Sequence, residues 1–196
     1  MRSRDVSLDG SEFRRGSWRQ LVIVVLAVAA LIGVAGVLLV PGDDAAYGAV
    51  GKAVNGLDQR SFDAFLGCAL GEQHLEKIGD NLALVAQIER ASLAGRSYGQ
   101  RLRESCMPLL DEMAAGLERL IPPDPLREDV AALDQAVDRF RSGWSGYIAY
   151  LEGLEGGFDP EADPAKRNLE QIAEAWRDYK VALVAFNRAV REKLDA

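Results

Sequence analysis

The sequence has few of the residues that most often bind metals or cofactors. Its 196 residues include one histidine, His74, and two cysteines, Cys68 and Cys106. A single histidine excludes a metal site built from several histidines of one chain, and His74 lies outside the Glu-x-x-His pattern of di-iron helical bundles. The Cys-x-x-Cys-His pattern of covalent haem attachment is also absent. We therefore predict no cofactor and no metal, and we expect His74 to be an exposed helix or loop residue.

Sequence patterns for nucleophilic catalysis are missing as well. Tyr147 stands where a nucleophile elbow around Ser145 would need its second glycine, and no Ser-x-x-Lys occurs. The acidic segment 159–170 resembles a calcium loop, but Pro164 replaces the glycine of its sharp turn. We favour a stiff acidic connection between two helices there. These absences predict that the protein is not an enzyme.

Charged residues are absent from the twenty consecutive apolar residues 21–40, a length that crosses a bilayer core as a helix. Five arginines precede this run, whereas the twenty residues after it contain only Lys52 and Arg60. The chain has 18 Arg and 5 Lys, a ratio typical of a GC-rich bacterial genome. Because positive residues stay on the cytoplasmic side, we predict a single-pass protein of a bacterial inner membrane. Residues 1–20 would form a cytoplasmic basic tail, and residues 41–196 would lie outside the cytoplasm.

A cleaved secretory signal is the main alternative for the run 21–40. Such signals have an apolar core of about 7–15 residues, and the cleavage-like triplet 27–29 lies inside the run. A twin-arginine signal is disfavoured because Gly16 and Ser17 follow the arginine pair where apolar residues would be expected. An uncleaved anchor is the best interpretation. Its small residues share one helical face, as in packed membrane helices: Ala29, Gly33 and Gly36.

The exported part is acidic, with 18 Lys and Arg against 27 Asp and Glu in residues 41–196. This excess of nine negative charges repels nucleic acid and anionic lipid headgroups. We therefore predict that neither binds this domain, and that the membrane is contacted through the single span.

Apolar residues of the exported part repeat at alternating spacings of three and four, and no period-2 alternation typical of strands appears. Such spacing keeps a narrow apolar stripe facing neighbouring helices. The sequence predicts an all-α fold, with an antiparallel bundle of four-helix type at 58–196 after a juxtamembrane helix or linker at 41–57. Long stripes occupy residues 130–154 and 169–190. One shorter stripe comprises Leu102, Cys106, Leu109, Met113, Leu117 and Leu120, and another comprises Leu82, Val85 and Ile88.

Prolines, glycines and capping residues locate the expected helix ends. Pro122 and Pro123 separate two long helices because proline blocks helix continuation. Ser97 and Asp163 are the expected N-caps. The predicted long helices lie near 80–94, 98–121, 126–155 and 165–194, and two shorter ones lie near 44–57 and 60–70.

Two groups of residues are candidates for binding. Small residues at i, i+3, i+4 and i+7 share one face of the helix 126–155: Ser142, Ser145, Gly146 and Ala149. They favour close helix approach, either inside the bundle or against a partner helix. Aromatic residues gather at one level of the last two helices: Trp144, Tyr147, Trp176 and Tyr179. They are either core residues or the lining of a pocket for an apolar or aromatic ligand.

We predict a disulfide between Cys68 and Cys106, because an even number of cysteines in an oxidising compartment favours pairing; two buried free thiols are the alternative. If residues 61–94 formed one straight helix antiparallel to 98–121, the cysteines would differ in height by roughly 27 Å. A disulfide requires Cα atoms within about 7 Å. The helix must therefore be interrupted at Gly71 or Gly79, with Asp80 as the next N-cap.

The anchor, the apolar stripes and the missing catalytic motifs favour a protein-interaction or scaffold module of the cell envelope. Its partner would be another envelope protein or a second copy of the chain. The alternative is a sensor-like bundle that binds an apolar or aromatic ligand.

Overall fold

The structure, a computed structural model, describes residues 43–71 and 80–196. The predictions for the membrane run 21–40, for its small residues Ala29, Gly33 and Gly36, and for His74 concern residues outside this part. Every element within the described part is helical, so the all-α prediction is confirmed there. No helix of these residues is both long enough and apolar enough to cross a membrane.

The first rod of the fold is a continuous helix made of α2 (Asp43–Leu57), the π-helical turn η1 (Asp58–Phe62) and α3 (Asp63–Leu70). A break between residues 57 and 60 was expected, and this prediction is wrong, because the backbone stays in the right-handed helical region on both sides of η1. A π turn absorbs an extra residue without ending the helix. The rod ends at Gly71, whose φ of 92° favours glycine.

The next helix that the structure describes, α4 (Asn81–Ser92), begins after Asp80. The Asp80 carboxylate accepts a 2.7 Å hydrogen bond from the backbone N–H of Ala83, as an N-cap does. Because α3 ends at Leu70 and α4 starts at Asn81, the predicted helix interruption between Cys68 and Asp80 is confirmed.

The second rod consists of α5 (Arg96–Arg101), the π turn η3 (Leu102–Cys106) and α6 (Met107–Glu118). Its N-cap is Gly95, at a φ of 56°, and not Ser97. The Ser97 hydroxyl lies inside the first turn and donates a 2.9 Å hydrogen bond to the carbonyl of Ala94.

The two shorter apolar stripes differ in part from their predictions. The π turn η3 adds one residue to a helical turn, so Leu110 rather than Leu109 is fully buried below it. On α4, Leu82 is 81% exposed and Leu84 lies in the core in its place.

The last two rods are α7 (Arg127–Glu152), preceded by the short 3-10 turn η4 (Asp124–Leu126), and α8 (Asp163–Leu194). Their long apolar stripes are confirmed. The buried residues of the stripes are Val130, Leu133, Val137, Phe140, Trp144, Tyr147 and Leu151, and Leu169, Ile172, Trp176, Tyr179, Phe186 and Val190, whereas Leu154 and Leu183 are half-buried. Ala162, not Asp163, is the N-cap of α8.

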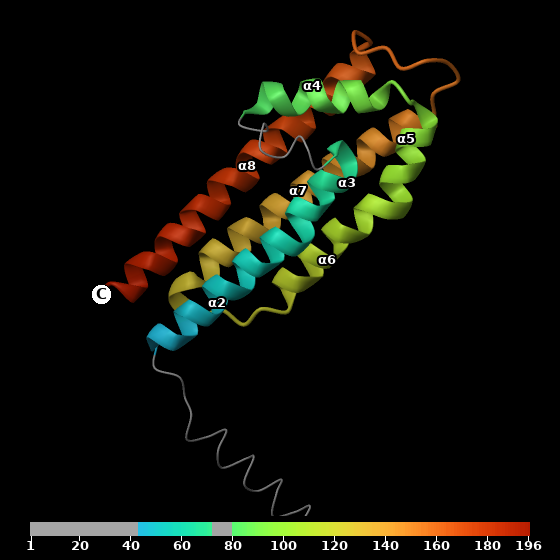
Figure 1. Cartoon of the computed structure of the whole chain (residues 1–196). Helices are drawn as coiled ribbons and strands as arrows, with labels where there is room; N and C mark the ends of the chain where they lie inside the picture. Colours follow the sequence, from blue (N-terminus) through green and yellow to red (C-terminus); the bar gives the residue numbers. More distant parts are fainter. Residues whose placement is uncertain (1–42, 72–79) are drawn as a thin grey trace, which may run out of the picture. The chain divides into compact units, whose positions relative to one another are not determined.

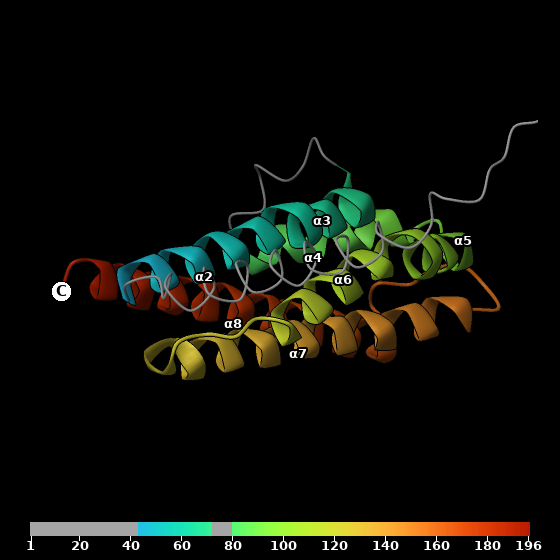
Figure 2. The same ribbon diagram turned by 90° about the horizontal axis from the view of Figure 1, so that it is seen from below.

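The four rods run up, down, up and down and form a helical bundle (Figures 1 and 2). α7 packs along α8, α6 packs against α7, and α2 packs against α8. α4 crosses the bundle near the end of α3 and contacts α8, α3 and α5. α2 begins at the end of the bundle where α8 terminates (Figure 1).

Candidate functional site

The aromatic residues that were candidates for a pocket lie in the bundle core. Trp144, Tyr147 and Tyr179 are at most 2% exposed, and Trp176 is 7% exposed. Phe62 of the first rod stacks on Tyr179 with ring centroids 3.8 Å apart, and it also stacks on Trp176 at 5.8 Å. These ring contacts fill this level of the core, which favours core packing over a ligand pocket.

The hydroxyl of Tyr147 joins α7 to α4. The Ser92 hydroxyl donates a 2.7 Å hydrogen bond to the carbonyl of Ile88. It therefore accepts its second hydrogen bond from the Tyr147 hydroxyl. Burial raises the pKa of Tyr147 well above its usual range, so this phenol is neutral and acts as a donor.

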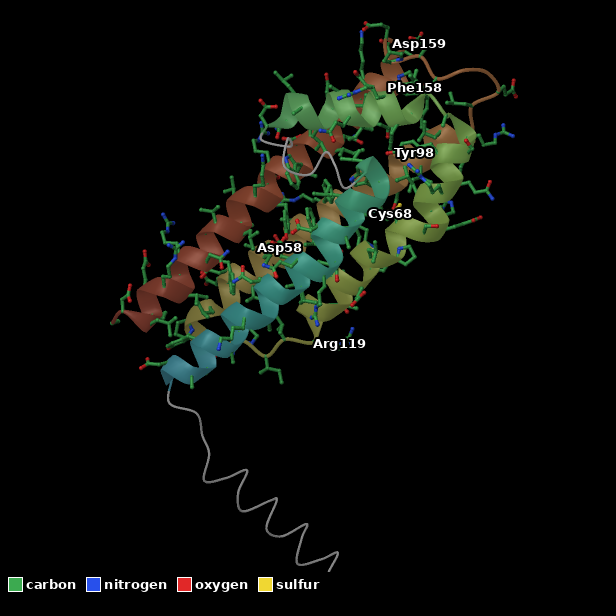
Figure 3. The ribbon with its side chains drawn as sticks, in the orientation of Figure 1. Asp58, Cys68, Tyr98, Arg119, Phe158 and Asp159 are labelled. Atoms are coloured by element: carbon green, nitrogen blue, oxygen red, sulfur yellow. A yellow bond between two sulfur atoms is a disulfide. The ribbon has the colours of Figure 1, made fainter. Side chains whose placement is uncertain are left out.

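Asp58 of the first rod, labelled in Figure 3, makes a polar contact with α8. The Tyr179 hydroxyl donates a hydrogen bond to the Asp58 carboxylate of η1. Burial raises the pKa of Asp58, and the hydrogen bond from Tyr179 opposes this rise. The pKa of Asp63 is also raised, first by burial and then by the negative charge of Asp58. No sequence pattern indicates this contact, because the sequence predicts a helix break between residues 57 and 60, where the structure has the π turn that contains Asp58.

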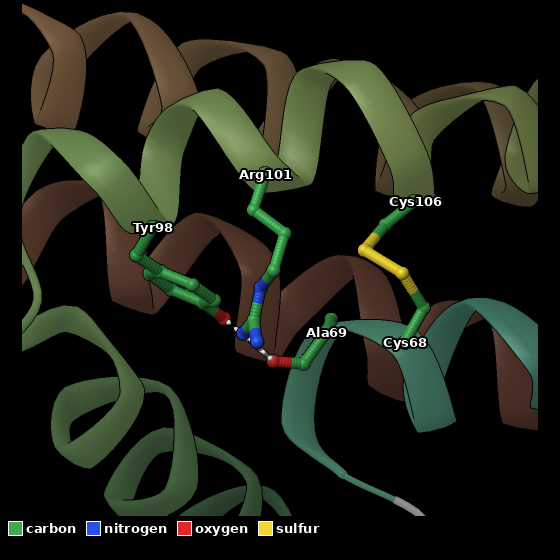
Figure 4. The surroundings of a disulfide bond; sticks show 5 residues. All are labelled: Cys68, Ala69, Tyr98, Arg101 and Cys106. Carbon is green, nitrogen blue, oxygen red and sulfur yellow. Dashed lines mark hydrogen bonds between the residues drawn. A yellow bond between two sulfur atoms is a disulfide. The ribbon is translucent and has the colours of Figure 1, made fainter.

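The predicted disulfide is present between Cys68 of α3 and Cys106 of η3, with Cα atoms 5.6 Å apart (Figure 4). Beside it, the Tyr98 hydroxyl and the Arg101 guanidinium donate hydrogen bonds of 3.2 and 3.4 Å to the carbonyl of Ala69. Carbonyls in the last turn of a helix lack intrahelical partners. The second rod thus holds the end of α3 covalently and by hydrogen bonds.

The small residues of α7 face solvent. Ser142, Ser145, Gly146 and Ala149 are all exposed, and they are named the α7 face below. They do not pack inside the bundle. The close approach of α7 to α8 is made instead by Gly143, where a Cβ atom would lie 3.4 Å from Cγ1 of Ile172.

A groove of about 420 Å³ borders the α7 face. It lies between α7 and α8, and its walls include Ser142 and Gly143 on one side and Ala175 on the other. Arg139 and Asp178 also line it, and their closest nitrogen and oxygen atoms are 3.6 Å apart across the groove. The surface therefore combines small side chains with charges of both signs.

Within residues 43–71 and 80–196, no three His, Cys, Asp or Glu side chains gather in a geometry that holds a metal ion. In the acidic segment 159–170, the Glu161 carboxylate lies 2.6 Å from the Lys166 ammonium. Because α8 already begins at Asp163, most of this segment is helix rather than loop.

Comparison of the chain with models of protein families, with curated proteins and with solved structures finds no match.

Proposed function

We propose that the chain is a single-span protein of a bacterial inner membrane whose helical bundle, outside the cytoplasm, binds another protein through the α7 face. The observation that carries this proposal is the exposure of four small residues, Ser142, Ser145, Gly146 and Ala149, on the outer side of α7. The inner side of the same helix is fully used by the core.

Gly146 is the residue of the α7 face that is least favourable in a helix. Glycine in a helix interior costs about 0.5–1 kcal/mol relative to alanine. Gly146 is exposed, and a Cβ atom there would meet only the side-chain oxygen of Asn168, at 3.3 Å. Contact with a partner helix would explain a glycine at this position, because helix axes approach more closely where the contacting side chains are small.

Sequence evidence supports the membrane part of the proposal. The charge-free run 21–40 has the length of a span, and five arginines precede it. The disulfide pair fits the same topology, since disulfides persist in oxidising compartments.

The alternative, a bundle that binds an apolar or aromatic ligand, has less support. A ligand at Trp144 and Trp176 would have to displace ring contacts such as that between Phe62 and Trp176. Screening of apolar ligands by tryptophan fluorescence separates the two functions, because a ligand beside either indole changes its emission.

Photo-crosslinking from the α7 face in native membranes tests the interaction. A photoreactive residue at Ala149 should yield a discrete crosslinked protein, whereas the same residue at Ala131 serves as the matched control. Both alanines are exposed. They are 18 residues apart, which is five helical turns or about 27 Å along the same side of α7. Equal crosslinking at both positions, or none at Ala149, would rule out the α7 face as the binding surface.

A further inference from the structure

The C-terminal half of α8 carries exposed apolar residues on the outside of the bundle. Val181 and Val184 are 64% and 68% exposed, and Leu194 is 44% exposed. Basic residues lie among them. Successive residues of an α-helix are about 100° apart around its axis, so six of these apolar and basic residues lie within less than half of the helix circumference. They are named the α8 strip: Lys180, Val181, Val184, Arg188, Arg191 and Leu194.

The α8 strip differs in charge from the rest of the domain. Three of its six residues are cations, while residues 41–196 have nine more acidic than basic residues, and the acidic residues beside it are Glu192 and Asp195. Glu192 lies 3.9 Å from Arg188, but both side chains are highly exposed, so their attraction is weak. Arg191 also lines a groove of about 600 Å³ between α2 and α8, which contains Lys52 and no acidic side chain.

The position of the α8 strip suggests what covers it. α8 terminates at the end of the bundle where α2 begins (Figure 1). The apolar run 21–40 stops three residues before Asp43, and three extended residues span about 10 Å. If the run is a membrane span, the groove and the end of the α8 strip lie within reach of the bilayer surface.

We propose that the α8 strip and the groove beside it rest on the phospholipid headgroups of the membrane that holds the chain. This inference depends on the proposed membrane anchor. Lys and Arg side chains are attracted to anionic headgroups, and exposed valine and leucine side chains enter the apolar boundary beneath them. Because the anchor keeps the bundle at a high local concentration near the lipid, individually weak contacts are sufficient.

The net negative charge of the domain does not prevent this docking. Charges farther apart than about 8 Å are largely screened at physiological salt. α8 has 32 residues and is about 48 Å long at a rise of 1.5 Å per residue. The headgroups therefore respond to the local cations and not to the net charge of the bundle.

The test uses the full chain in vesicles of phosphatidylcholine and phosphatidylglycerol. A Val184→Cys variant, with Cys68 and Cys106 oxidised, carries an environment-sensitive fluorophore, and headgroup spin-labelled lipids act as quenchers. An Ala131→Cys variant is the control, because Ala131 is exposed and lies in the first turns of α7, the helix that begins at the end of the bundle where α2 begins. We expect the label at residue 184 to be quenched several-fold more than the label at residue 131. The difference should shrink after Arg188→Glu and Arg191→Glu substitution, in high salt, or in phosphatidylcholine alone.

The outcomes distinguish this inference from the proposed function. If the chain does not float with the vesicles, the membrane anchor is wrong and both proposals fail. If it floats but the two labels are quenched equally, only the docking inference is overturned. A change at residue 184 that occurs in native membranes and not in lipid vesicles would also overturn it, because the occupant of the α8 strip would then be a protein.

Discussion

At the scale of single residues, the contact between Asp58 and Tyr179 links stability to pH. Asp58 is half-buried, and burial raises its pKa above the ordinary value of 3.8. The folded state therefore holds this proton more tightly than the unfolded chain does. As pH rises from about 4 through the folded pKa, the native state must ionise a poorly solvated carboxyl, and the free energy of unfolding decreases over that window.

Replacement of Asp58 by asparagine should remove this loss. The amide oxygen still accepts the hydrogen bond from Tyr179, and no charge is buried. We expect Asp58→Asn to equal or exceed the parent protein in stability at pH 7 and to lose this advantage below about pH 4. Urea unfolding at the two pH values measures the effect, with Asp44→Asn on the same rod as the control for loss of an exposed charge. The same stability difference at both pH values would contradict the assignment.

At the residue scale, substitution of Gly146 tests whether this residue serves folding or binding. Gly146→Ala should leave the free energy of unfolding unchanged or raise it by up to about 1 kcal/mol, because alanine is the better helix former. The nearest atom, Oδ1 of Asn168, belongs to an exposed amide that can shift by a few tenths of an ångström. The same substitution should weaken partner crosslinking from Ala149. Loss of both stability and crosslinking would mean that Gly146 serves the fold.

At the scale of elements, the sequence predicts what repeats and misses what occurs once. The stripes of α7 and α8 extend over many turns, so the alternation of three and four residues identifies their buried sides. The π turns η1 and η3 each insert a residue without a signal in the apolar pattern. Helix continuity at Leu57 and the burial of Leu110 instead of Leu109 were therefore not predictable. The short α4 crosses other helices, and no repeat showed that Leu82 faces solvent.

The disulfide gives a prediction about the order in which elements unfold. Cys68 and Cys106 are separated by 38 residues, and closing a loop of that size stabilises the fold by about 4 kcal/mol in the chain-entropy model. Replacing both cysteines by alanine should lower the free energy of unfolding by a few kcal/mol. Limited proteolysis should then cut residues 58–80 before it cuts the core of α7 and α8. Two titratable thiols in the native, oxidised protein would show that the bridge does not form.

At the scale of the whole molecule, spacing located the candidate residues but not their surroundings. The spacing i, i+3, i+4 and i+7 of small residues is the same for a face inside the bundle and for a face exposed to solvent. Only the fold shows that Ser145 and Gly146 are exposed. Trp144 and Trp176 were equally ambiguous between core and pocket, and the fold resolves this because Phe65 packs against Trp144 and Phe62 stacks on Trp176. Net charge likewise averages over distances that exceed electrostatic screening, so it concealed the cations of the α8 strip.

The orientation of the whole chain in the membrane is the prediction on which the others depend. Five arginines precede the run 21–40: Arg2, Arg4, Arg14, Arg15 and Arg19. Moving such a cluster of positive charges across a bilayer is strongly disfavoured. A reporter that is active only outside the cytoplasm, fused after Ala196, should therefore be active. Replacing the five arginines with glutamine should reduce this bias, and the same fusion without residues 1–40 should be inactive. Activity of a cytoplasmic reporter on the intact chain would place the bundle in a reducing compartment, where neither the disulfide nor docking on the outer lipid surface would be expected.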